Sequence, residues 1–237
     1  MQNDEQSLLT PSMIAAENVR FMTRVYGWMT GGILVTGYIA WQISLNNEVA
    51  LEIARNRLLF WSLIIAQLGA VVVLSAWMKK LSALGAAGLY LLYAALTGVT
   101  LSTIFLVYTG ESISQVFALT AFSFAGLSSF GLVTKRDLGP IGSFCTMGLF
   151  GMIGFSLISI FFPEMQSGVS GKVYGLVGVL VFAGLTAYDT QKIKAMNIIG
   201  NEGTVEDRKE AIFGALTLYL DFINLFLSIL RLMGNRK

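Results

Sequence analysis

Seven apolar runs, most of them about 20 residues long, constrain the fold of this 237-residue chain more than any other feature. Each run can cross the roughly 30 Å hydrocarbon core of a bilayer as a helix. Lipid offers no hydrogen-bond partners, so only helices and closed barrels can span it. Barrel strands alternate over about ten residues, whereas these runs are evenly apolar. The sequence therefore predicts an all-α polytopic membrane protein, a seven-transmembrane-helix bundle with spans at 25–45, 59–78, 82–108, 113–133, 141–162, 173–193 and 211–232.

The composition supports a membrane protein and excludes several classes of function. Charged residues make up 13% of the chain, about half the share in a typical soluble domain. The net charge of +2 gives no reason to expect a nucleic acid partner. The absence of histidine excludes histidine-based catalysis, histidine metal sites and histidine pH switches. The single cysteine, Cys145, cannot form an internal disulfide.

The distribution of charge predicts the organisation of the chain across the membrane. Residues 1–20 are polar, and we expect a cytoplasmic N-terminal arm there, followed by a single seven-helix transmembrane domain at 21–237. With the N-terminus inside, ten of the 16 Lys and Arg residues fall on the inner side and six on the outer side. Three of those six belong to the C-terminal tail, so its side of the membrane stays open. The connections are too short to hold a soluble domain.

Two aspartates lie inside the last two predicted spans, where a charged carboxylate costs about 2.5–3.5 kcal/mol. Asp189 lies near the inner end of its span, and Lys192 at i+3 offers an ion pair on the same helix face. Asp221 lies about ten residues from either end of its span. Thr217 and Asn224 are the nearest polar groups on that helix, and neither can neutralise a charge.

Two carboxylates that face each other in lipid do not both ionise readily, so we expect Asp189 and Asp221 to titrate as a unit if they meet. The pair becomes a dianion only when the pH rises or a cation arrives, and hard oxygen ligands suit calcium. The two residues are therefore the predicted pH sensor, with calcium as the candidate metal ion. Counting from the inner ends places Asp189 about 5 Å deep and Asp221 about 15 Å deep, so the two meet only if the helices are staggered or water reaches down to them.

Two segments carry a resemblance to a known family. AYDTQKIK (187–194) and LYLDFINLFLSILR (218–231) resemble the signature segments of the Bax inhibitor-1, or transmembrane Bax inhibitor motif, family, and TKRDLGP (134–140) is similar to its bacterial members. The resemblance extends over nearly the whole chain past residue 20. It implies a seven-helix fold in the bacterial inner membrane with the last helix central. It also implies that Asp189 and Asp221 form a paired sensor that governs a calcium leak.

The resemblance also implies two contacts around the second predicted helix. Some members hold a latch between the first aspartate and an arginine at the inner end of that helix. The matching stretch, WMKKLS, offers Lys79 or Lys80, and lysine lacks the planar fork of arginine. Some members carry a glutamate within the same helix. The nearby residue here is Gln67, which provides a neutral polar contact instead.

Three functions fit these features. The first is a pH-sensitive calcium or cation leak without a bound cofactor. The second is a non-transporting regulator that binds a partner such as a membrane protease through the 1–20 arm and the 195–210 loop. The third is an intramembrane aspartyl protease, but Asp221 stands in LTLYLD rather than in the Gly-x-Gly-Asp of those enzymes. We expect a leak and no enzymatic activity.

Overall fold

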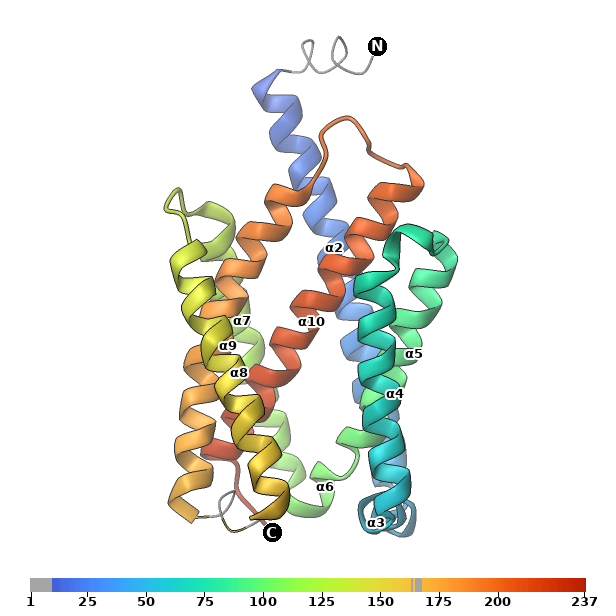
Figure 1. Cartoon of the computed structure of the whole chain (residues 1–237), viewed down its shortest axis with the longest axis vertical. Coiled ribbons are helices and arrows are strands. Elements are labelled where there is room, and N and C mark those ends of the chain that lie inside the picture. The colour runs from blue at the N-terminus through green and yellow to red at the C-terminus, as the bar shows by residue number, and fades with distance from the viewer. Residues whose placement is uncertain (1–9, 163, 165–167) are drawn as a thin grey trace. The chain divides into compact units, whose positions relative to one another are not determined.

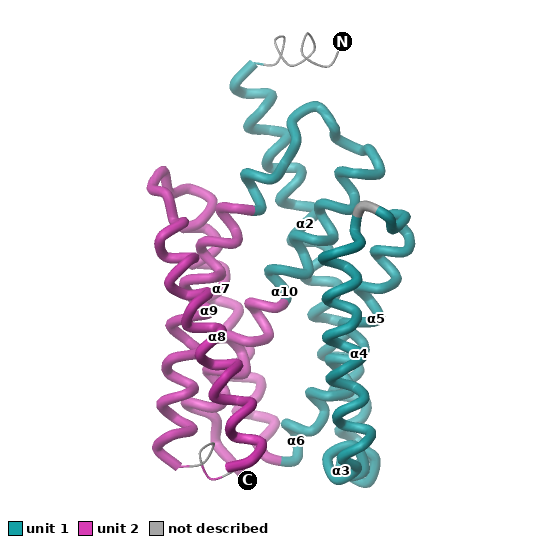
Figure 2. Tube along the Cα trace, viewed as in Figure 1, with its two compact units in different colours: residues 1–106, 193–219 teal, residues 107–192, 220–237 magenta. Residues whose placement is uncertain are grey.

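The computed structural model describes residues 10–162, 164 and 168–237, and every regular element over these residues is helical (Figure 1). The elements are α2 (Pro11–Ser44), α3 (Asn47–Arg55), α4 (Arg57–Ala76), the 3₁₀ turn η1 (Met78–Lys80), α5 (Ala83–Leu101), α6 (Ile104–Val107), α7 (Gly110–Val133), α8 (Gly139–Phe161), α9 (Gly168–Met196) and α10 (Val205–Met233). They form two compact units (Figure 2). Unit 1 is Met1–Leu106 with Ile193–Tyr219, and unit 2 is Val107–Lys192 with Leu220–Lys237.

The predicted membrane bundle is confirmed, but its count of seven helices is not. Among the described residues, six segments are long and apolar enough to cross a membrane: α4, Ala83–Val107 (α5 with α6), α7, α8, α9 and α10. The predicted span 25–45 lies in α2, which is outside that set. This helix already begins at Pro11, because the Thr10 hydroxyl accepts a hydrogen bond from the Met13 N–H and proline suits the first helical position. Residues 11–20 of the predicted arm are therefore helical, and residues 1–9 lie outside the described part.

Two local features differ from the predicted spans. The connection after the first span contains a short helix, α3, which Asn46 caps through its side chain. The predicted span 82–108 is interrupted between α5 and α6. There the Ser102 hydroxyl donates to the Val99 carbonyl (2.7 Å) and the Thr103 hydroxyl to the Thr100 carbonyl (2.8 Å). Such local bonds compete with the helical ladder, which explains the break inside an apolar run.

In unit 1, α5 packs against both α2 and α4. A buried polar contact holds this core together. The Thr36 hydroxyl lies 2.8 Å from the Ala94 carbonyl and 2.6 Å from the Tyr219 hydroxyl. The predicted polar contact of Gln67 is made between helices, since its Nε2 lies 2.6 Å from the Thr100 hydroxyl. These bonds satisfy polar groups that lipid would leave unpaired.

In unit 2, the second half of α10 packs on α7 through aromatic rings and on α9 at Gly175 and Gly178. The ring of Phe222 on α10 meets Phe117 and Phe124 of α7 edge-to-face, with centroids 5.5 and 5.6 Å apart. Over an 18-residue window, 72% of α10 is buried, against 11% of α4. The first half of α10 belongs to unit 1 and the second half to unit 2. A helix at the centre of a bundle is expected to be largely buried. The high buried share of α10 agrees with the predicted central position of the last helix.

Candidate proton and cation site

Asp189 of α9 and Asp221 of α10 lie together in unit 2, where their carboxyl groups are close enough to interact electrostatically. Asp221 is only 5% exposed. Its Oδ2 atom is buried and has no hydrogen-bond partner among the described residues. Asp189 is half-buried. Asp189 and Asp221, the two acids inside predicted spans, are therefore neighbours. One carboxylate oxygen, Oδ2 of Asp221, accepts no hydrogen bond from the described residues.

The sequence predicts that Asp189 lies nearer the inner membrane surface than Asp221, but this difference in depth does not keep the two residues apart. Asp221 follows Val205, the first residue of α10, by 16 residues, or about 24 Å along the helix. The part of α10 before Leu220 packs in unit 1, so Asp221 is the second residue of α10 in unit 2. The unit 2 part of α9 ends at Lys192, three residues after Asp189. Both aspartates therefore lie near the same end of unit 2.

The residues that flank Asp189 fix α9 against its neighbours. The Tyr188 ring fills the space beside Gly142 of α8, where even a Cβ atom would collide with it. The Thr190 hydroxyl lies 2.9 Å from that of Ser128 on α7. Gln191 accepts a hydrogen bond from the Leu138 N–H (3.0 Å). The signature segment thus holds α9 against α7, α8 and the residue that precedes α8.

The polar groups that the sequence offered as partners are used elsewhere. The Thr217 hydroxyl and the Asn224 amide bond to carbonyl groups of their own helix, at 3.1 and 2.8 Å. Lys192 is within electrostatic range of Asp189, but no ion pair within 4.0 Å joins them among the described residues. Its Nζ atom lies over the Tyr188 ring, 5.7 Å from the centroid. The described neighbours therefore leave the pair without a contacting cation.

The predicted latch lysines belong to the other unit. Lys79 and Lys80 lie in η1 of unit 1. Lys80 is exposed, and the side chain of Lys79 is outside the described part of the structure. The latch therefore stays a prediction.

The pair offers a divalent cation few ligands. No group of three or more acidic, cysteine or histidine ligands suited to a metal occurs among the described residues. Calcium takes six to eight oxygen ligands, and Asp189 with Asp221 supplies only part of that number. The two carboxylates alone therefore do not complete a calcium coordination sphere.

Sequence reasoning missed the small residues that let the helices around the pair approach. Gly131 of α7 packs directly on the backbone carbonyl of Ala187, two residues before Asp189. Gly142 makes room for Tyr188, as described above. Small residues in a membrane span indicate close helix packing. That signal was present at both glycines, but it does not identify the partner helix.

Comparison with known proteins agrees with the signature segments. The family described as inhibitor of apoptosis-promoting Bax1 matches residues 18–237. The chain belongs to the Bax inhibitor-1 family. Over 218 residues, 92% of each chain, it is 48% identical to the inner membrane protein YbhL of Escherichia coli. It is 41% identical to a Borreliella burgdorferi protein (92% and 93% covered) and 34% identical to a membrane protein of Streptococcus pyogenes (91% and 92% covered). Similarity to other Bax inhibitor-1 family members thus extends over nearly the whole chain.

Proposed function

We propose that this Bax inhibitor-1 family member is a pH-sensitive calcium or cation leak, gated by protonation of the Asp189–Asp221 pair. The observation that carries the proposal is the proximity of the two carboxyl groups, with Asp221 buried and its Oδ2 without a hydrogen-bond partner among the described residues. The similarity to an inner membrane protein of Escherichia coli supports a place in the bacterial inner membrane.

A shared proton explains how the pair responds to pH. With one proton between them, the carboxyl groups hold α9 and α10 together by a hydrogen bond that carries a single negative charge. When that proton leaves, two like charges face each other in a medium of low dielectric, and their repulsion is far stronger than in water. Among the described residues, the other titratable groups that interact with the pair are Lys192 on α9 and the Cys145 thiol on α8. Rising pH therefore favours separation of the two helices.

In this proposal, a cation binds the same pair of carboxylates that holds the proton. A divalent ion that reaches the charged pair offsets the repulsion without needing a full set of protein ligands. Conduction requires binding that is strong enough for entry and weak enough for release. Two carboxylates with few further ligands meet that requirement better than a complete calcium cage would.

The decisive experiment measures calcium entry into vesicles that contain the purified chain and an internal calcium dye, from about pH 6 to about pH 8. The wild-type chain is expected to conduct more calcium as the pH rises. Asp221→Asn and Asp189→Asn remove the like-charge repulsion and should each abolish the pH response. Glu48→Gln, at an exposed acid of unit 1, is the matched control and should respond as wild type.

Two results would contradict the leak. The first is flux that ignores pH in the wild-type chain, and the second is flux that both asparagine variants leave unchanged. Absence of flux at every pH would favour the alternative, a non-transporting regulator of a partner such as a membrane protease. We assign the chain no enzymatic reaction.

A further inference from the structure

Unit 2 contains a basic cavity far from the aspartate pair. It has a volume of about 490 Å³ and lies where α9 begins and α10 ends. Three of its lining residues are cations, Lys172, Arg231 and Arg236, and none is an acid. Arg231 follows Asp221 by ten residues, or about 15 Å along α10. The cavity is therefore separate from the proposed sensor.

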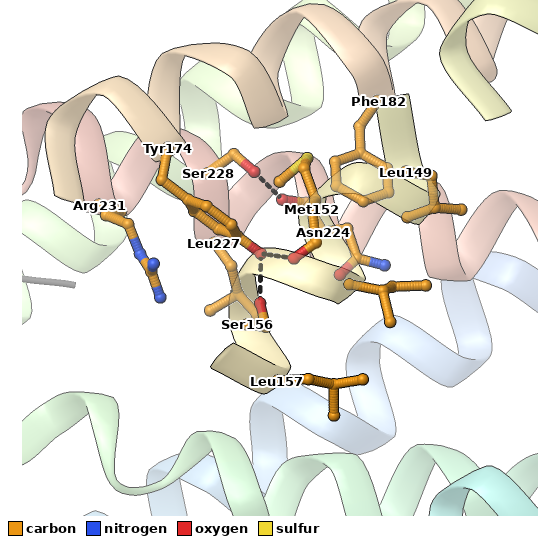
Figure 3. Close-up of a pocket in the computed structure, with 11 residues that line it drawn as sticks. Leu149, Met152, Ser156, Leu157, Tyr174, Phe182, Asn224, Leu227, Ser228 and Arg231 are labelled. Carbon is orange, nitrogen blue, oxygen red and sulfur yellow. Dashed lines mark hydrogen bonds between the residues drawn. The ribbon is translucent and has the colours of Figure 1, made fainter. Parts of the chain in front are cut away.

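Arg231 is held in place with its hydrogen-bond donors unused. Its guanidinium lies over the ring of Tyr174, 4.7 Å from the centroid (Figure 3). The Tyr174 hydroxyl is in turn fixed by that of Ser156, 2.8 Å away. Among the described residues, Arg231 forms no ion pair or hydrogen bond, so the N–H groups along its planar edge remain available. Arg231 also lines a second cavity of about 270 Å³ between α8, α9 and α10.

The other two cations also lack an acidic partner. Lys172 is exposed on the first turns of α9, and no ion pair is formed by it among the described residues. Arg236 lies over the Tyr108 ring, 5.9 Å from its centroid, and likewise has no described acidic partner. Three unpaired positive charges around one cavity are complementary to an anion.

An apolar groove adjoins the basic cavity. It has a volume of about 510 Å³ and runs between α8 and α9. Val169 lines both the groove and the basic cavity, so the two adjoin at this residue. Gly148 and Gly151 of α8 line the groove, and a Cβ atom built on Gly151 would meet nothing within 4 Å. The remaining wall is apolar, with Phe155, Val173 and Val177.

We propose that the basic cavity and the adjoining groove together bind one anionic phospholipid, with the phosphate at Arg231 and Lys172 and an acyl chain in the α8–α9 groove. A guanidinium edge pairs with phosphate through two parallel hydrogen bonds, and the apolar groove has no role in binding a free anion. A zwitterionic headgroup would bring a positive charge toward three cations. The site is independent of the proposed leak, because neither aspartate lines it.

Native mass spectrometry of the full chain in mild detergent tests the site. Phosphatidylglycerol is added to one sample and phosphatidylcholine to another at equal concentration. We expect phosphatidylglycerol to be retained preferentially. Arg231→Gln and Lys172→Gln should each weaken its binding by about fivefold, the effect of one basic residue on an anionic lipid. Arg57→Gln, at an exposed arginine of unit 1, should leave binding unchanged.

A second pair of variants tests the groove. Gly151→Leu places a side chain in the groove and should reduce retention of phosphatidylglycerol. Gly126→Leu adds the same side chain to open space on α7, outside the groove, and should leave retention unchanged.

Three outcomes would overturn the proposal: equal retention of the two lipids, wild-type retention in both charge variants, or equal competition by soluble glycerol phosphate, which indicates a simple anion site. Lys172 is exposed, so its variant should fold and give a clear answer even if the Arg231 variant does not.

Discussion

At the scale of single residues, the unpartnered oxygen of Asp221 is the most informative atom in the molecule. A buried carboxylate without partners is costly, and this one faces a second carboxylate rather than a cation. If the pair is a sensor, its chemistry works against stability. Selection for stability alone would remove such a pair of buried carboxylates. We therefore propose that Asp189 and Asp221 are kept for a function.

The corresponding prediction concerns stability. Asp221→Asn and Asp189→Asn should each leave the folded protein as stable as wild type, or more stable by up to about 2 kcal/mol, because a neutral amide is cheaper than a carboxylate in lipid. Thermal unfolding in detergent at pH 7 measures the change. A large loss of folded protein in both variants would instead indicate a structural ion pair, with Lys79, Lys80 or Lys192 as the first partners to test.

Glu202, a carboxylate outside the membrane spans, differs from Asp221 because it is paired with cations. Glu202 accepts hydrogen bonds of 2.8 Å from both Nε and Nη2 of Arg20, and one of 3.3 Å from Arg24. The bond from Arg20, followed by that from Arg24, lowers the pKa of Glu202. A lowered pKa in the folded state stabilises the protein above the ordinary glutamate pKa of about 4.3, and this stabilisation is lost as the pH falls through the lowered pKa.

Glu202→Gln should therefore lower the melting temperature by the same small amount at about pH 6 and about pH 8, where Glu202 stays ionised. The difference between variant and wild type should shrink as the pH falls below the ordinary glutamate pKa, and it should vanish once the pH is below the lowered pKa of folded Glu202. The pH response of calcium flux should be that of wild type. Melting curves over this pH series measure the effect, and a difference that changed between pH 6 and pH 8 would show that the Arg20–Glu202 contact takes part in the pH response.

At the scale of helices, close packing of α7 on α9 determines where Asp189 lies. A Cβ atom at Gly131 would collide with the carbonyl of Ala187, whereas one at Gly126 would meet nothing within 4 Å. Gly131→Ala must push the two helices apart, and we expect it to destabilise the protein by about 1–3 kcal/mol. Gly126→Ala should be neutral or stabilising by up to about 1 kcal/mol, since alanine favours helix.

Both variants are measured by thermal unfolding and by the vesicle assay. Because Ala187 precedes Asp189 by two residues, Gly131→Ala should also alter the pH dependence of flux, while Gly126→Ala should not. Equal stability of the two variants would mean that α7 and α9 do not pack as closely as the structure has them.

The helices also show how much of the fold could be predicted from the sequence. Hydropathy located six of the seven predicted spans, because lipid requires long apolar helices, but the first predicted span lies in α2, which begins 14 residues earlier and is outside the set of six. It missed α3, whose nine residues are too short to give a clear pattern, and the break at Ser102 and Thr103, where hydroxyl bonds replace the helical ladder. Asp189 and Asp221 stood out because each is a charge within an apolar run. Their contact could not be derived, since counting along α10 did not reveal that its first half packs in unit 1.

At the scale of the whole chain, contacts inside each unit constrain which segments share a side of the membrane. In unit 1, the Arg20–Glu202 ion pair at 2.8 Å places the start of α2 beside the loop that precedes α10. In unit 2, the Lys237 N–H donates to the Val107 carbonyl (2.9 Å), and the Thr109 N–H to that of Asn235 (3.1 Å). The C-terminal tail therefore lies beside the start of α7.

Helix α10 runs from the loop beside the start of α2 to the C-terminal tail beside the start of α7. Its 29 residues are about 44 Å long, enough to cross a hydrocarbon core of about 30 Å even when tilted. Because the excess of Lys and Arg favours an inner N-terminus, we predict that residues 12 and 202 are inside and that residues 111 and 237 are outside.

Single cysteines at these four positions, introduced with Cys145→Ala, test the arrangement by labelling with a membrane-impermeant thiol reagent in intact spheroplasts and in inverted vesicles. Ser12→Cys and Glu202→Cys should react only in inverted vesicles, and Glu111→Cys and Lys237→Cys only in spheroplasts. The tail contains Arg236 and Lys237, which the positive-inside rule disfavours on the outer face. If positions 202 and 237 react from the same side, α10 is re-entrant. In that case α9 alone would span the bilayer at the proposed sensor, and the leak as proposed, with both sensor helices crossing the membrane, would be wrong.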